Sequence, residues 1–361
     1  MGVRQAKERS QQGTPGVGVT TRPPLPSRPG GPIGWAQSLG RRVSVARELG
    51  PFIGMVIAVL IFQFGSGGAF LSAIEVTNIL TIAAALAIIG AGVTMLIISG
   101  EFDLSVGTVF AIVPVWWGIL IVNNGYNPQL AFVMAMGLAA GIGLVNGFLT
   151  IVFKIPSFIV TLGTFYALQG LVIVMTGGFE IVLPDMPITN VLGANVGGTF
   201  LTMETVWTVA IVAIAWFVLE QTRFGNWIFA AGSSRGVARA MGVPERRVKF
   251  VLFALCSVLA GFAGCCVAAR LLTVGSTFGT DYNLLAIVAT VVGGTSLFGG
   301  RGTMVGTLIG AILVSSIQPG LIELGAGGTW YQAVVGVVLV IAVLFNIRFE
   351  VFRSKRVGMR N

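Results

Sequence analysis

Two acidic residues, Glu101 and Asp103, are the first candidates for chemistry in this sequence. They lie in residues 99–107, which read SGEFDLSVG and separate two apolar stretches. Ion-driven carriers keep such groups as relays, because a charge in hydrocarbon is costly and is retained for a purpose. Asp103 and Ser105 can instead cap the helix that follows, since a carboxylate or hydroxyl accepts from the free N–H groups of a first turn. We favour capping and keep the relay as its alternative.

The usual components of an enzyme site are missing from the sequence. It contains no histidine, which removes Ser-His-Asp and Cys-His catalysis and the commonest metal ligand. None of its lysines follows a Gly-x-x-x-x-Gly loop of the kind that binds ATP phosphates. Residues 300–306, GRGTMVG, have the wrong spacing for a dinucleotide fingerprint. We therefore expect no catalytic residue, metal or cofactor in this chain, and we disfavour a membrane enzyme acting on lipid-linked substrates.

The polar stretch at residues 223–249 carries a candidate docking element. Ser233 or Ser234 can cap a short helix that ends at Gly242, because Pro244 prevents its continuation. This helix would lie against lipid headgroups or dock into a partner protein, and we favour docking. The residues assigned to docking are Ser234, Arg235, Arg239, Met241, Gly242 and Arg246.

Five glycines interrupt the apolar sequence in residues 291–303, VVGGTSLFGGRGT. A broken helix at membrane depth is tolerated where it is buried in protein or lines a cavity, so we predict a structure at the pore or its gate. A plain tight turn is the alternative. Together with the acidic segment, the pore or gating candidates are Glu101, Asp103, Ser105, Gly293, Gly294, Thr295, Gly299, Gly300 and Arg301.

Aromatic and amide side chains within the apolar runs are candidates for contact with a substrate. Most aromatic residues in membrane spans pack or anchor at the interfaces instead, which is the alternative at each position. The candidates are Trp116, Asn146, Phe165, Tyr166 and Gln169, with Trp117 and Gln318 as further ones.

Composition places these residues in membrane spans. The 361 residues are 55% hydrophobic and 10% charged, whereas soluble domains average roughly 25% charged residues. The basic residues that give a net charge of +9 lie between apolar runs and not beside aromatics on one soluble face, so we expect no nucleic-acid binding. Cys256, Cys265 and Cys266 lie within one apolar run, and we interpret them as small packing residues.

The sequence predicts an all-α, polytopic integral membrane protein of about ten transmembrane helices. A span needs about 20 mostly apolar residues. The ten runs are residues 51–71, 77–99, 104–122, 128–153, 155–176, 203–219, 248–269, 283–297, 303–324 and 331–346. Glycine pairs four residues apart predict close helix packing at 137/141, 143/147 and 306/310. The longest segment predicted outside the membrane on the external side, residues 177–202, is expected to form a structured lip at the pore mouth.

Alternation of ten spans with both termini inside is supported by the basic residues. Of the 22 lysines and arginines, 21 then fall in inside segments and only Arg270 falls outside. The predicted organisation is a disordered basic cytoplasmic tail at residues 1–48, a membrane domain at 49–347 and a basic cytoplasmic tail at 348–361.

Four blocks resemble the permease subunits of bacterial ABC importers of the ribose, xylose and related simple-sugar branch. Residues 99–107 are similar to that family's SGGIDLSVG element, residues 224–242 to its cytoplasmic coupling loop, residues 286–310 to its GGTSLxGGRGT segment, and residues 156–164, PSFIVTLGT, to a fourth run. Glu101 and Phe102 replace glycine and isoleucine of the first element.

The resemblance, over residues 74–346, implies a permease domain that forms the translocation path for a simple sugar. It implies a second copy or a paralogue in the core, cytoplasmic ABC ATPase subunits that grip the coupling loops and use ATP and Mg, and an extracytoplasmic sugar-binding protein. It also implies a place in the bacterial cytoplasmic (inner) membrane. The alternative is a secondary transporter driven by an ion gradient through Glu101 or Asp103.

Overall fold

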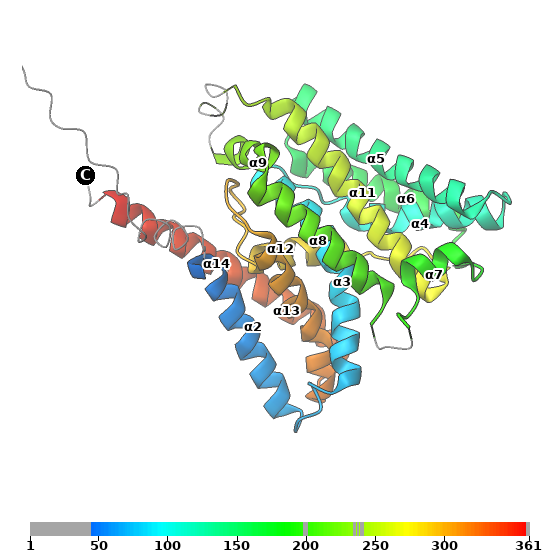
Figure 1. The fold of residues 1–361 in the computed structure, drawn as a ribbon, viewed down its shortest axis with the longest axis horizontal. Coiled ribbons are helices and arrows are strands. Elements are labelled where there is room, and N and C mark those ends of the chain that lie inside the picture. The colour runs from blue at the N-terminus through cyan, green and yellow to red at the C-terminus, as the bar shows by residue number, and fades with distance from the viewer. Residues whose placement is uncertain (1–44, 198–200, 234–235, 237, 239–241, 359–361) are drawn as a thin grey trace, which may run out of the picture. The chain divides into compact units, whose positions relative to one another are not determined.

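The computed structural model describes residues 45–197, 201–233, 236, 238 and 242–358, and these residues are mostly helical. The helices are α2 (Val45–Gly65), α3 (Ala73–Ile98), α4 (Val106–Val122), α5 (Pro128–Val152), α6 (Ser157–Thr176), α7 (Pro187–Gly193), α8 (Met203–Gln221), α9 (Arg223–Ser233), α11 (Glu245–Leu271), α12 (Tyr282–Val292), α13 (Met304–Glu323) and α14 (Tyr331–Gly358), with a 3-10 turn η1 (Gly328–Trp330). Figure 1 shows their arrangement.

Every predicted apolar run overlaps one of these helices. Six helices are long and apolar enough to cross a membrane, by length and composition: α3, α5, α6, α8, α11 and α13. The other four runs correspond to the shorter apolar helices Leu49–Gly65, Val106–Val122, Tyr282–Val292 and Tyr331–Leu344. A polytopic membrane fold is therefore confirmed, while the count of ten spans stays a prediction. The terminal helices exceed the predicted membrane domain, because α2 begins at Val45 and α14 ends at Gly358.

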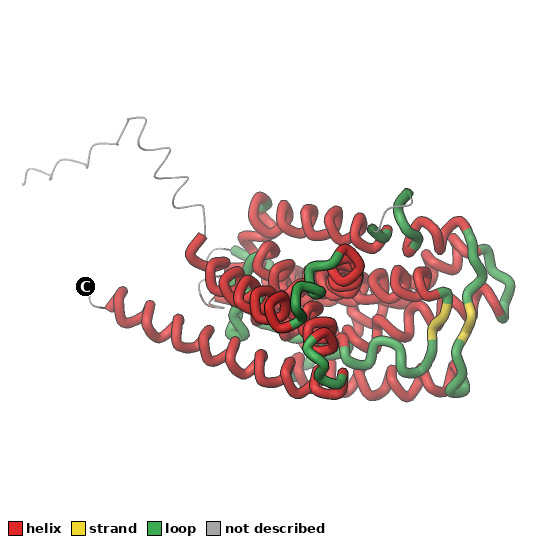
Figure 2. The backbone as a smooth tube through the Cα atoms, turned by 90° about the horizontal axis from the view of Figure 1, so that it is seen from below, coloured by secondary structure: helices red, strands yellow, loops and turns green. Residues whose placement is uncertain are grey.

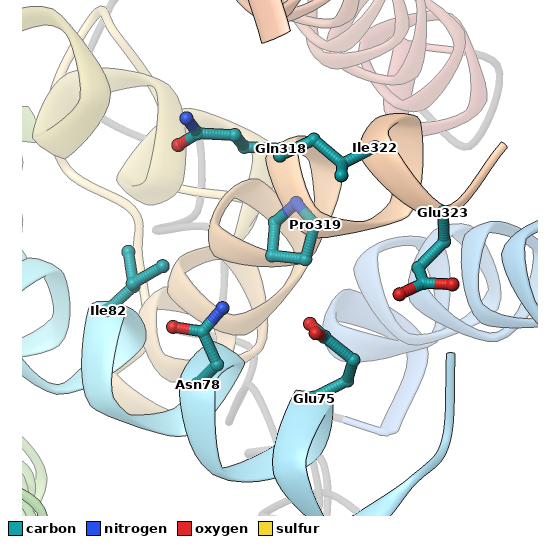
Figure 3. A pocket seen from close by; sticks show the side chains of 7 residues that line it. All are labelled: Glu75, Asn78, Ile82, Gln318, Pro319, Ile322 and Glu323. Carbon is teal, nitrogen blue, oxygen red and sulfur yellow. The ribbon is translucent and has the colours of Figure 1, made fainter. Parts of the chain in front are cut away.

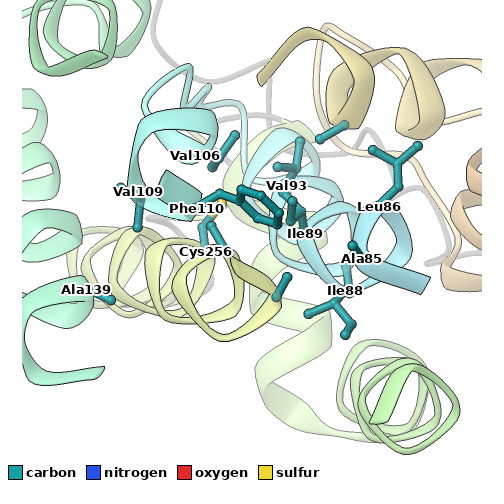
Figure 4. Packing of buried hydrophobic residues seen from close by; sticks show 14 of the residues in the cluster. Ala85, Leu86, Ile88, Ile89, Val93, Val106, Val109, Phe110, Ala139 and Cys256 are labelled. Atoms are coloured by element: carbon teal, nitrogen blue, oxygen red, sulfur yellow. The ribbon is translucent and has the colours of Figure 1, made fainter. Parts of the chain in front are cut away.

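The central helix of the fold is α3. Its sequence is apolar on every side, as expected of a helix that is buried all round. It packs against α8, α11, α12 and α13. Figure 4 shows Ile89 and Val93 of α3 beside Phe110 of α4 and Cys256 of α11. All three cysteines are buried and none forms a disulfide, which confirms their interpretation as packing residues.

Glycine allows α11 to lie close to its neighbours. A Cβ atom on Gly143 of α5 would overlap the carbonyl oxygen of Phe253, and one on Gly264 would overlap that of Phe110. The glycine pairs 143/147 and 306/310 pack closely, as predicted. At the pair 137/141 no atom of the described residues lies within 4 Å of a Cβ built at either glycine, so this pair makes no close packing within the described chain.

A small structured region lies where α4, α7 and α11 end. Strand β1 (Ile181–Val182) pairs antiparallel with β2 (Thr273–Val274), and Figure 2 shows them side by side. The strands correct the all-α prediction in this one detail. Arg270 Nε, at the end of α11, lies 2.9 Å from Glu204 Oε1 of α8. The described part of residues 177–202 is thus structured, as expected.

Candidate functional site

The blocks singled out in the sequence meet at one end of α3. The amide of Gly300 donates to the carbonyl oxygen of Ile98 at 2.7 Å, and the amide of Phe102 donates to Ser157 Oγ at 3.1 Å. A Cβ atom on Gly232 would overlap that same Ile98 oxygen. Segments from four distant parts of the sequence therefore form one contact region. We call it the junction, defined as residues 98–105, 156–164, 232–233 and 293–303.

Glycine is required by the backbone at several positions of the junction. Gly100, Gly299 and Gly300 have φ of 85°, 82° and 71°, the left-handed region that other residues rarely adopt. Gly294 has φ 92°. A Cβ on Gly299 would also lie only 3.2 Å from the Cα of Gly100. These glycines shape the backbone of the junction, while the predicted place of Gly294, Gly299 and Gly300 at the pore or its gate stays a prediction.

The glycine-rich segment ends one helix and begins another. α12 ends at Val292, and α13 begins at Met304 after Thr303, whose Oγ1 accepts from the amide of Gly306 at 3.0 Å. Between them, the amide of Ser296 donates to the carbonyl of Arg301 at 3.0 Å, which closes a compact loop. Thr295 is fully buried and the side chain of Arg301 is exposed. A role in gating stays a prediction.

A chain of buried polar side chains runs from the junction into α5 and α6. Asp103 Oδ1 accepts from the amide of Ser105 at 2.8 Å and from its hydroxyl. Asn146 Nδ2 donates to Ser105 Oγ at 2.9 Å, and Thr164 Oγ1 donates to Asn146 Oδ1 at 2.7 Å. The structure thus joins two gating candidates to Asn146, a candidate for the substrate path.

Contrary to the capping prediction, Asp103 and Ser105 do not cap the first turn of α4 with their side chains. Ser105 is the N-cap residue of α4, yet its side chain accepts from no amide of the first turn. The carboxylate of Asp103 instead receives the amide of Ser105 itself, because the chain turns before the helix begins. The other oxygen, Asp103 Oδ2, is buried and has no hydrogen-bond partner among the described residues.

Glu101 belongs to a buried ion pair. Lys249 Nζ lies 2.7 Å from Glu101 Oε1 and 3.4 Å from Glu245 Oε1. Glu101 is 8% exposed and Lys249 is 4% exposed. Sequence reasoning missed Lys249 because it was counted among the loop charges. The spacing of four residues between Glu245 and Lys249 on one helix was the available signal.

The predicted docking element is described only in part. Residues 223–233 form α9, a helix that was not predicted, and Ser233 ends it with Oγ donating to the carbonyl of Phe229 at 2.7 Å. Ser233 is therefore no N-cap. Gly242 has φ 71° and the amide of Val243 donates to the carbonyl of Ala238 at 3.0 Å, as expected where a helix ends at Gly242.

Two docking candidates fall within the described residues, Gly242 and Arg246, and the side chain of Arg246 is exposed. Ser234, Arg235, Arg239 and Met241 lie outside the described residues. Beside them, α9 is amphipathic: Ile228 is buried, whereas Arg223 and Trp227 are exposed. The exposed side chains of this segment are therefore basic and aromatic, a combination that suits a protein partner.

The substrate-path candidates on α4 and α6 are not gathered around a large cavity. Trp116 packs against the core, and Trp117 is fully buried with Nε1 donating to the carbonyl of Pro128. Phe165 contacts Tyr166 edge to face, and Tyr166 is 67% exposed. Gln169 lines a cavity of about 10 Å³, room for about one water molecule.

A larger cavity, of about 190 Å³, lies between α3 and α13 at their ends remote from the junction. Figure 3 shows its lining residues: Glu75, Asn78 and Ile82 from α3, and Gln318, Pro319, Ile322 and Glu323 from α13. Two carboxylates and two amides can hydrogen-bond to a polyhydroxyl molecule. Gln318 was a candidate from the sequence. Glu75 and Glu323 were missed, because only the packing of α3 on α13 brings them together.

Known proteins share the sequence over most of this structure. Residues 75–343 match the family model described as the permease component of the branched-chain amino acid transport system. The match begins at the start of α3 and ends within α14, so it includes the junction and the cavity.

Several curated relatives align with more than four fifths of this chain. The ribose import permease protein of Bacillus subtilis is 36% identical over 310 residues, 84% of this chain and 93% of the relative. A probable ABC transporter permease protein of Escherichia coli is 35% identical over 335 residues, 92% of this chain and 98% of the relative. The xylose/arabinose import permease protein of Sulfolobus acidocaldarius is 33% identical over 303 residues, 82% of this chain and 83% of the relative.

Proposed function

Because the chain belongs to the family of permease components of transport systems matched by residues 75–343, we propose that it forms the translocation path of an ATP-driven importer for a simple sugar. The observation that carries this proposal is the set of relatives named for the import of ribose and of xylose or arabinose. They align over more than four fifths of this chain. The sugar would be a monosaccharide such as ribose or xylose.

Residues 223–249, beside the junction, are the part of the chain that we assign to the energy supply. ATP and Mg would be bound by cytoplasmic ATPase subunits, and these would contact α9 and the segment that ends at Gly242. The basic and aromatic exposed residues Arg223, Trp227 and Arg246 support this assignment. A second copy of the chain or a paralogue would complete the path, and an external binding protein would deliver the sugar.

The junction would face the cytoplasm of the bacterial cell, with the chain in the inner membrane and both termini inside. In support, segments predicted to be inside lie together: Ser157 contacts Phe102, Gly232 packs on Ile98, and Gly300 bonds to Ile98. Placing that end inside puts 21 of the 22 basic residues on the cytoplasmic side.

The cavity between α3 and α13 would then open toward the outside and serve as a place where the sugar enters the path. Its carboxylates and amides, from Glu75, Glu323, Asn78 and Gln318, can accept from and donate to sugar hydroxyls. The cavity beside Gln169 holds about one water, so the path is closed there to a sugar in this conformation.

An ion-gradient-driven carrier is the second candidate function. The buried Asp103 Oδ2, which has no partner among the described residues, favours it. The ion pair of Glu101 with Lys249 argues against Glu101 as the relay, since its proton-accepting oxygen is already paired.

The two functions are separated by reconstituting the chain with its partner ATPase and binding protein in liposomes. Uptake is measured for ribose, xylose, arabinose and fructose, and for leucine, because the family model is named for branched-chain amino acids. We expect ATP-dependent accumulation of one sugar. Accumulation of leucine alone would overturn the sugar assignment. Uptake that needs a proton or sodium gradient and ignores ATP would establish the carrier instead.

A further inference from the structure

The buried ion pair of Glu101 with Lys249 joins two segments that the sequence marks for different tasks. Glu101 stands between the end of α3 and Asp103, in the segment assigned to the path. Lys249 stands in the second turn of α11, at the end of residues 223–249, the stretch assigned to docking. The Nζ–Oε1 distance is 2.7 Å. Among the described residues this is the only ion pair that joins residues 98–105 to residues 223–249.

Packing alone does not explain why the charges are there. Removing two charges from water costs several kcal/mol for each ion, and their attraction offsets this only with good geometry. A hydrophobic pair of similar size would fill the same space at less cost. The pair therefore has a use other than filling the core.

The remaining contacts between the two segments are of a different kind. Gly232 lies against the carbonyl of Ile98 through backbone atoms without side chains, so a small displacement there changes the packing without moving a neighbour in a fixed direction. A short charged hydrogen bond between Lys249 and Glu101 resists both separation and sliding. A movement of the first turns of α11 is thus transmitted to Glu101.

From Glu101 the polar chain continues into the helices of the path. Asp103, two residues further, holds Ser105, and Ser105 receives the amide of Asn146 at 2.9 Å. Asn146 accepts from Thr164 at 2.7 Å. Glu101 is joined to Asp103 through the backbone, and from Asp103 onward hydrogen bonds between side chains link α4, α5 and α6, so a displacement of Glu101 bears on these helices.

We propose that the Glu101–Lys249 ion pair is the coupling link that passes movement of the docking segment to residues 98–105 and from there to the translocation path. Both are positioning residues: they act through Asp103 and Ser105 and need not touch the sugar. The proposal rests on the proposed function, because it names how the energy supply reaches the path.

The test compares two neutral double variants in the reconstituted importer. Glu101→Gln/Lys249→Met removes both charges of the link, so neither Glu101 nor Lys249 is left charged without the other; Glu245 keeps its charge in the first turn of α11. Glu204→Gln/Arg270→Met removes the other buried pair of α11 in the same way and is the matched control. Uptake of the transported sugar and ATP hydrolysis are measured per folded molecule, with folding assessed by thermal unfolding.

We expect the first double variant to fold, to hydrolyse ATP at a rate within twofold of the unmodified protein, and to lose at least tenfold in sugar uptake. The control double variant should retain uptake within twofold. If the pair were merely structural, the first double variant would retain sugar uptake, because a neutral pair restores the packing. Uptake within twofold in Glu101→Gln/Lys249→Met would overturn the proposal.

The conservative variant Lys249→Arg keeps the charge and should retain at least half of the uptake. It keeps the proposal testable if the double variant fails to fold. An uptake loss in Lys249→Arg as large as in Lys249→Met would show that the charge is not what matters, and would overturn the link.

Hydrogen–deuterium exchange of the purified chain tests the link without transport. Lys249→Met should speed exchange at amides of residues 98–105 as well as near residue 249. A change confined to residues 245–253 would overturn the proposal. If the unmodified importer accumulates no sugar, the proposed function fails, and the exchange result still decides whether the two segments are mechanically joined.

Discussion

α11 carries a basic side chain near each end, and each is paired with a glutamate from another part of the chain. Lys249 pairs with Glu101 at 2.7 Å and Arg270 pairs with Glu204 at 2.9 Å. The 21 residues that separate the two cations span about 32 Å of helix, close to the roughly 30 Å thickness of the hydrocarbon layer. An ion pair between a basic residue of α11 and a glutamate thus lies near each end of this helix.

The surroundings of the two pairs differ. Glu204 and Arg270 join two helices, α8 and α11, beside a region fixed by the β1–β2 pairing and by α7. Glu101 lies in a turn between helices, beside glycines in the left-handed region, where backbones meet without side chains. The first pair joins two helices that otherwise meet at few residues, beside the β1–β2 pairing, whereas the second joins α11 to the turn that follows α3, a helix that packs along α11.

The largest expected change in the free energy of unfolding is at the Glu204–Arg270 pair. Arg270→Ala leaves Glu204, which is fully buried, without its cation, and we expect a loss of about 3 kcal/mol in the free energy of unfolding. Glu204→Gln leaves only Arg270, whose side chain is 30% exposed and can be hydrated, so about 1 kcal/mol is expected. Denaturation in detergent measures both. Equal losses would show that burial of Glu204 does not decide the energy.

Gly232→Ala should have the next largest effect, at the junction. Its Cβ would overlap the carbonyl oxygen of Ile98 and meet the amide nitrogen of Gly300, so the backbones must separate. We expect a loss of about 2 kcal/mol in stability, as for other overpacked sites, together with reduced sugar uptake. The matched control is Gly137→Ala in α5, where no atom of the described residues lies within 4 Å of the new Cβ. Unchanged melting and uptake in Gly232→Ala would contradict the close approach of these segments.

The sequence predicted those structural features that neighbouring residues encode. Apolar length located a helix for each of the ten runs, and the glycine cluster at residues 293–302 correctly predicted an interruption between α12 and α13. These features are encoded by neighbouring residues, since apolar length and glycine act where they stand. The helix α9 was missed because Gly225 and Gly232 within it are typical of a loop. Both glycines are there to let α9 approach other backbones.

The ion pairs could not be predicted because their members are distant in the sequence. Glu101 and Lys249 are separated by 148 residues, and Glu204 and Arg270 by 66. Counting positive charges by segment assigned Lys249 to a loop and treated Arg270 as an exception. Their pairing follows from how α11 packs against its neighbours, which no single stretch of sequence determines. The cavity of Glu75 and Glu323 was missed for the same reason.

Thr164→Val tests whether the hydrogen-bonded polar side chains that begin at Asp103 act as far as α6. The substitution keeps the shape of the side chain and removes the hydroxyl that donates to Asn146 at 2.7 Å. One lost hydrogen bond should cost about 1 kcal/mol of stability. Because Thr164 is the last residue in this series of hydrogen-bonded side chains, sugar uptake should fall less than after loss of the Glu101–Lys249 pair. Thr161→Val, at a hydroxyl that bonds only within its own helix, is the control.

Gln318→Ala should have the smallest effect on stability, and it examines the end of the molecule remote from the junction. The side chain is exposed in the cavity between α3 and α13, so stability should change by less than about 0.5 kcal/mol. If sugars enter there, the sugar concentration that gives half-maximal uptake should rise several-fold. The maximal rate should stay the same, because the junction is intact. Gln129→Ala, at an exposed glutamine in the first turn of α5, is the control and should change neither quantity. A fall in the maximal rate without a change in the half-maximal sugar concentration would assign Gln318 to coupling. Sugar entry and coupling would then not be separated between the two ends of the molecule.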